Sequence, residues 1–82
     1  MTAEEMFKEL GYKQVGSYVG LMYKKESTER NEIFGEYDKI KYIHFVEKRV
    51  SIHVATCFGG KGIANMDELK AINQQCKELG WL

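Results

Sequence analysis

IKYIHFV at residues 40–46 and VSIHVATCF at residues 50–58 are the two stretches that decide the fold of this chain. Both are rich in β-branched and aromatic residues, which are enriched in strands. The short connection between them places Glu47 and Lys48 at the centre of a two-residue turn. This turn lacks the usual Asn-Gly pair, but its length and its flanks still predict a β-hairpin.

The register of this hairpin follows from the turn. With Glu47 and Lys48 at its centre, one face carries two apolar pairs, Phe45 with Val50 and Ile43 with Ile52. The opposite face then carries the pairs Tyr42 with His53 and His44 with Ser51. We therefore expect one face to pack in a core and the other to hold two histidines diagonally within reach of each other.

The sequence before this hairpin predicts further strands. Apolar residues alternate with their neighbours over residues 18–25, and a short strand is expected at 12–15. Residues 26–38 are polar and charged, with Ile33 and Phe34 as their only strongly apolar members. This composition predicts a long loop, or a loop that holds one short strand.

Amphipathic helices are predicted at both ends of the chain. Thr2 and Glu5 form a capping box ahead of the apolar stripe Ala3, Met6, Phe7 and Leu10, and Asn65 and Glu68 do the same ahead of the stripe Leu69, Ile72, Cys76 and Leu79. KELGY at residues 8–12 and KELGW at 77–81 read as final helical turns, each followed by a glycine and an aromatic residue. Because both terminal helices are capped, we expect a complete unit.

These elements predict an α+β fold in a single domain, residues 1–82. It is a two-layer sandwich with the N- and C-terminal helices packed on one face of a three- or four-stranded antiparallel meander sheet.

Composition narrows the function classes. Twelve basic and twelve acidic residues cancel, so no whole-domain positive field favours nucleic acid. The chain has no long apolar run and no leader pattern, and its two cysteines lack CxxC spacing. We expect a reduced, cytoplasmic protein that binds no membrane.

The predicted open face of the sheet is unusually aromatic, and its candidate partner-binding residues are Tyr18, Met22, Tyr42, His44 and His53, with Ile40 and Cys57 beside them. Three interpretations stay open. The face is solvated or covered by the 26–38 loop, it binds a protein partner or a second copy of the chain, or it stacks nucleic-acid bases on Tyr18 and Tyr42 with Lys24 or Arg49 near the phosphates. The RNP-type motif of sheet-based RNA modules is missing.

The chemical motifs are weak. His44, His53 and Cys57 fall short of the four convergent ligands of a structural zinc site, and Cys57 is about 13 Å along the strand from His53. The loop Gly59–Gly62 departs from the P-loop pattern and is better explained as a connection that lets the last helix cross back over the sheet. No nucleophile, acid pair or triad can be argued, so we expect no catalytic residue, cofactor or metal.

Two end segments carry a resemblance. MTAEEMFKELGY at residues 1–12 and MDELKAINQQCKELGW at 66–81 resemble a loose group of short proteins carried by phages and mobile elements of Gram-positive bacteria. The resemblance covers about a third of the chain and implies a small cytoplasmic accessory protein. It carries over no functional residue, because the shared motifs are helix stripes and caps.

The expectation that follows is a non-enzymatic interaction module. It would bind a protein partner, or itself as a homodimer, through the open sheet face and the 26–38 segment. A single-stranded nucleic-acid binder is the alternative, and the discriminating feature is whether Lys24, Lys41, Lys48 and Arg49 gather beside the aromatic residues.

Overall fold

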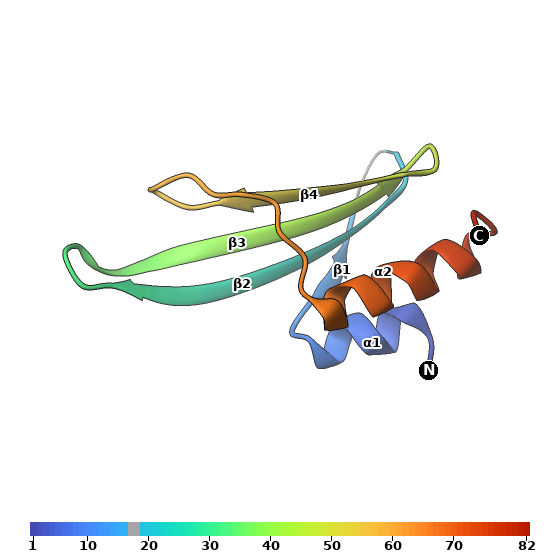
Figure 1. The fold of residues 1–82 in the computed structure, drawn as a ribbon, viewed down its shortest axis with the longest axis horizontal. Helices are drawn as coiled ribbons and strands as arrows, with labels where there is room; N and C mark the ends of the chain where they lie inside the picture. Colours follow the sequence, from blue (N-terminus) through green and yellow to red (C-terminus); the bar gives the residue numbers. More distant parts are fainter. Residues whose placement is uncertain (17–18) are drawn as a thin grey trace.

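The computed structural model describes residues 1–16 and 19–82, so Tyr18 lies outside the described residues. The described residues form two helices and four strands (Figure 1). In chain order these are α1 (Ala3–Glu9), β1 (Lys13–Val15), β2 (Leu21–Asn31), β3 (Gly35–Val46), β4 (Arg49–Ala55) and α2 (Met66–Glu78). The strands pair antiparallel in the order β1-β2-β3-β4, which confirms the predicted α+β sandwich with a meander sheet.

The register of the β3–β4 hairpin is as predicted. Phe45 pairs with Val50, Ile43 with Ile52, and Tyr42 with His53. Glu47 and Lys48 have φ angles of 50° and 59°, the left-handed conformation that a type I′ turn requires at both central positions. Residues other than asparagine and glycine adopt this conformation here because the paired strands on both sides hold the turn in place.

The prediction of a loop over residues 26–38 is wrong. Strands β2 and β3 continue through this segment as one long hairpin, pairing from Leu21 with Phe45 to Asn31 with Gly35. The Asn31 side chain accepts hydrogen bonds from the amides of Ile33 and Phe34 at the tip. The alternation that marks a strand is absent here because this half of the hairpin extends beyond the helices (Figure 1), so neither face packs against a core.

Both helices begin and end as the sequence indicates. Capping boxes at Thr2 and Asn65 start them. At the C-terminal ends, the Tyr12 amide donates to the Phe7 carbonyl at 2.9 Å, and the Trp81 amide donates to the Cys76 carbonyl at 2.8 Å. Gly11 and Gly80, with φ angles of 91° and 75°, make the intervening left-handed turns. Each cap folds its aromatic residue back toward the core.

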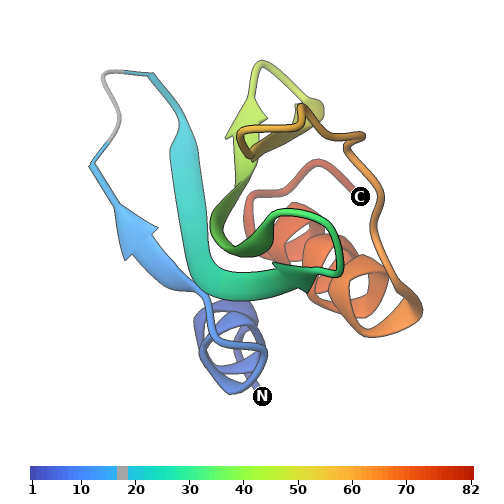
Figure 2. The ribbon, with the colours of Figure 1, turned by 90° about the vertical axis from the view of Figure 1, so that its left-hand side faces the viewer.

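The core lies between the two helices and the near half of the sheet, the half that includes β1. Its fully buried members include Phe7, Tyr23, Ile43 and Phe45, and the rings of Phe7 and Tyr23 stack with centroids 4.1 Å apart. In the view of Figure 2 the two helices lie together on one side of the curled sheet. Neither helix covers the other face of the sheet.

Helix α2 is rotated relative to the predicted stripe. Leu69 and Leu79, expected in the core, are 45% and 39% exposed, whereas Glu68, Ala71 and Gln75 are buried. Ile72 and Cys76 pack partly against the core. The rotation follows from hydrogen bonds, because the sheet and the loop after α1 offer polar partners to Glu68 and Gln75.

Candidate functional site: the open face of the sheet

Four of the five candidate residues lie on one surface. Met22 pairs with His44, and Tyr42 pairs with His53, so alternation places all four side chains on the face opposite the helices. Met22, Tyr42 and His44 are half-buried, and His53 is exposed. The fifth candidate, Tyr18, lies outside the described residues. We call this surface the open face.

His44 is oriented by the chain segment ahead of β2. Its Nε2 atom lies 2.8 Å from the carbonyl oxygen of Val19, a hydrogen bond that needs the tautomer with a proton on Nε2, or the doubly protonated ring. The ring therefore ties the segment ahead of β2 to the C-terminal end of β3. This contact gives His44 a positioning role within the face.

Basic side chains gather only partly beside the aromatic residues. Lys24 is paired across the strands with Tyr42, and its Nζ lies 5.9 Å from the ring centroid. The same Nζ lies 2.8 Å from Oε1 of Glu26, and this hydrogen bond raises the pKa of Lys24 and lowers that of Glu26. Lys41 points to the opposite face. Of the lysines that could contact nucleic-acid phosphates beside these rings, Lys24 is therefore ion-paired and Lys41 lies on the other face.

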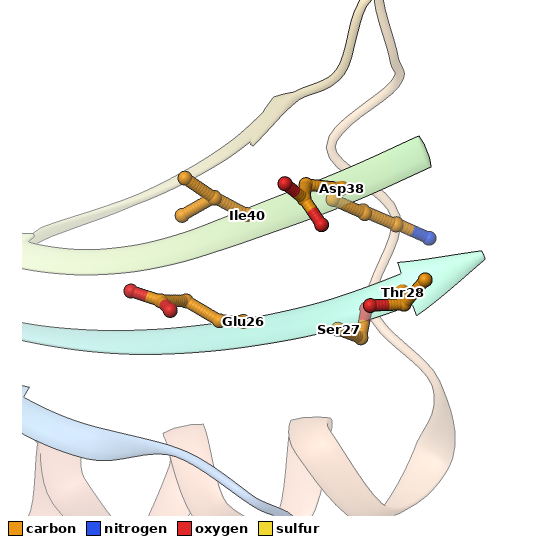
Figure 3. Close-up of a pocket in the computed structure, with 6 residues that line it drawn as sticks. Glu26, Ser27, Thr28, Asp38 and Ile40 are labelled. Atoms are coloured by element: carbon orange, nitrogen blue, oxygen red, sulfur yellow. The ribbon is translucent and has the colours of Figure 1, made fainter. Parts of the chain in front are cut away.

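A hollow of about 270 Å³ lies farther along the β2–β3 hairpin (Figure 3). Its rim includes Glu26 and Thr28 on β2, and Asp38 and Ile40 on β3. Sequence reasoning missed this hollow, because Glu26, Thr28 and Asp38 fall in the segment predicted as a loop. In the structure the two carboxylates lie diagonally across paired strands, which makes this part of the open face acidic.

Charge is divided along the open face. The near half carries Lys13, Lys24 and Arg49. The strand register places them on this face, because Lys13 is opposite Lys24, Lys24 is opposite Tyr42, and Arg49 is opposite Val46. The far half carries three acids and one base: Glu26, Glu36, Asp38 and Arg30. Tyr42 and Ile40 lie between the two halves, and their cross-strand partners Lys24 and Glu26 form an ion pair beside them. The face is thus basic at one end, has these two residues and the ion pair in the middle, and carries a net negative charge at the other end.

A buried polar cluster on the opposite side of the sheet was also missed by sequence reasoning. The Glu68 carboxylate accepts hydrogen bonds from Lys41 Nζ at 2.8 Å, from the Asn65 amide at 2.9 Å and from the Tyr12 hydroxyl. Beside it, the Tyr23 hydroxyl donates to Gln75 Oε1 at 2.7 Å. These contacts join α2 to β2, β3 and the loop after α1.

The pKa values of this cluster reflect its environment. Burial raises the pKa of Glu68, but the hydrogen bonds from Lys41, Tyr12 and the Asn65 backbone, together with the Lys41 charge, lower it by more, so the net shift is downward. Burial and the contact with Glu68 raise the pKa of Tyr12. Burial, with the charges of Glu4 and Glu78, raises the pKa of Tyr23 to about 12. Glu68 is therefore a structural anion.

The described residues offer little for catalysis or metal binding. Burial raises the pKa of the Cys76 thiol and so disfavours the reactive thiolate. Cys57 is exposed in the turn after β4. Across residues 1–16 and 19–82, no three acidic, histidine or cysteine side chains come together as a metal site.

Comparisons with known proteins add no assignment. No protein-family model, curated protein or solved structure matches this chain. Neither α1 nor α2 has the length and apolar character needed to cross a bilayer.

Proposed function

We propose that this chain is a non-enzymatic interaction module whose open face binds a second copy of the chain. The observation that carries the proposal is the division of charge along that face. The helices cover the other side of the sheet, so Met22, Tyr42 and His53 remain available for contact. Contiguous apolar and aromatic area of this kind is typical of interfaces.

The charge pattern favours a second copy over an unrelated protein. In a two-fold arrangement each surface meets itself in reverse, so the basic near half of one copy faces the acidic far half of the other. A two-fold axis passing near Tyr42 and Ile40 would bring these two residues of one copy against the same two residues of the other. Arg49 at one end would then lie opposite Glu36 of the other copy.

Molecular mass as a function of concentration tests the proposal. In low salt, sedimentation equilibrium should give a mass that rises from 9.5 kDa toward twice that value as concentration increases. Tyr42→Asp, which replaces an aromatic ring beside the proposed two-fold axis with a negative charge, should keep the chain monomeric. Asp67→Lys, on the exposed start of α2, is the matched control and should associate as the parent does. Circular dichroism shows whether each variant is folded.

Charge reversal gives a second, more specific readout. Arg49→Glu and Glu36→Lys should each weaken association, and the double variant should recover it, because the two reversed charges meet across the two-fold axis. A parent chain that stays at 9.5 kDa up to near-millimolar concentration would refute the proposal.

Single-stranded nucleic-acid binding is the competing function. The ion pair of Lys24 with Glu26 and the placement of Lys41 on the opposite face count against it. A salt-dependent gel shift that Tyr42→Ala abolishes would favour it over self-association.

A further inference from the structure

A second cavity, of about 380 Å³, lies on the helix side of the sheet beyond the N-terminal end of α2. It forms where the segment that connects β4 to α2 folds back over β3 and β4. This connection can be followed in Figure 1. A Cβ atom on Gly60 would lie 2.7 Å from Cγ1 of Val54, and one on Gly62 would lie 2.3 Å from the Ile52 carbonyl oxygen. These two glycines let the segment approach β4 closely and form one wall of the cavity.

The cavity is cationic. Lys39, Lys41 and Lys61 line it, and no acidic residue does. Lys41 is held by Glu68 and by the carbonyl of Ile63. Lys39 and Lys61 have no ion-pair partner in the described part of the chain. Glu29 lies diagonally across the strands from Lys39 but does not line the cavity. Two positive charges that form no ion pair within the described residues therefore border the same small volume, which favours an anionic ligand.

Aromatic rings form the other wall. Tyr37 and Phe58 line the cavity and meet edge to face, with centroids 4.8 Å apart at 87°. Phe58 is 47% exposed, although Phe34 also packs beside it with centroids 5.1 Å apart. An exposed ring beside unpaired lysines is suited to a ligand that combines a planar body with a negative charge.

The loop backbone adds hydrogen-bond donors. The amides of Phe58 and Gly59 donate to the Thr56 hydroxyl and carbonyl, which fixes the turn. The next two amides, of Gly60 and Lys61, donate no hydrogen bond within the residues that the structure describes. Unused backbone N–H groups next to lysines are common features of phosphate sites.

We propose that this cavity binds a small phosphorylated ring compound of the size and chemistry of a nucleoside monophosphate. Lys39, Lys61 and the free amides contact the phosphate, and the planar ring lies against Phe58. The volume falls within the usual range for small-molecule sites, roughly 300–1,000 Å³. The site lies on the helix side of the sheet, so it does not depend on self-association through the open face.

The test is a titration of the ¹⁵N-labelled chain with AMP, adenosine and inorganic phosphate, followed by amide chemical shifts. AMP should give saturable shifts at Gly60 and Lys61, adenosine should bind much more weakly, and phosphate alone should bind more weakly than AMP. Lys39→Gln and Lys61→Gln should each lower AMP affinity by about tenfold, because each removes one charge-assisted contact.

Lys70→Gln, on the exposed surface of α2, is the matched control and should bind AMP as the parent does. These lysines are on the surface or at a cavity rim, so the variants should remain folded, and the amide spectrum itself verifies this. The proposal is overturned if AMP gives no saturable shift, if adenosine or phosphate binds as tightly as AMP, or if Lys70→Gln weakens binding as much as Lys61→Gln.

Discussion

Glu68→Gln should destabilise the fold in a pH-dependent way. The carboxylate is 4% exposed and accepts hydrogen bonds from Lys41, Tyr12 and the Asn65 amide. Glutamine keeps the volume and can still serve in the capping box, but it removes the charge that Lys41 faces. The substitution therefore isolates the electrostatic part of the cluster.

The expected loss is about 2 kcal/mol, the value of one hydrogen bond between charged groups. A larger loss is not expected, because the Lys41 side chain is 14% exposed and part of its charge can be rehydrated. For a domain of this size the total free energy of unfolding is about 4–12 kcal/mol. With a urea m-value of about 1 kcal/mol/M, the midpoint should fall by up to about 2 M.

The stability difference between the parent chain and Glu68→Gln should depend on pH. The pKa of Glu68 is lowered in the folded state, so its contribution is fully present above its unfolded value of 4.5 and is lost as pH falls through the folded pKa. Urea unfolding followed by Trp81 fluorescence should therefore show a gap between parent and variant at neutral pH that narrows below about pH 4.

The matched control is Glu9→Gln, on the exposed side of α1, which should change stability by less than about 0.5 kcal/mol. If Glu68→Gln costs no more than Glu9→Gln, or if its cost is the same in acid as at neutral pH, the electrostatic account of this cluster is wrong.

Two further substitutions test a buried hydrogen bond and a close approach of two backbone segments. Tyr23→Phe leaves the buried Gln75 amide oxygen without its hydroxyl donor, and thermal unfolding should report a loss of about 1–2 kcal/mol; a neutral result would mean that this hydrogen bond does not hold α2. Gly62→Ala places a Cβ against the Ile52 carbonyl and should cost about 1–3 kcal/mol in urea unfolding, whereas Gly16→Ala, which meets nothing within 4 Å, should cost little; equal effects would contradict the close-approach argument.

Local patterns predicted the elements that contact the core. The capping boxes at Thr2 and Asn65, the glycine-ended helices and the register of the β3–β4 hairpin all follow from side chains within a few residues of one another. The far half of the β2–β3 hairpin was missed because it lacks such a local pattern. Strands that pack against no core need no apolar alternation, so residues 26–38 have the composition of a loop.

The candidate sites also include features that the sequence predicted and features that it did not. Period-two alternation was enough to place Met22, Tyr42, His44 and His53 on one face, because strand geometry fixes which side each residue takes. It could not reveal that Glu26 and Asp38 extend this face, since their pairing depends on the long hairpin. It also could not bring Lys39 and Lys61 to one cavity.

The sequence by itself determined the helices, their caps, the tight turn and the two-sided character of the sheet. Only the tertiary structure decided how α2 is rotated, which carboxylate is buried and which lysines line the same cavity. Glu68 and Lys41 are 27 residues apart, and their contact exists only because packing of α2 on the sheet removes both from water together. Contacts of this kind depend on chain geometry over distances that no local residue pattern encodes.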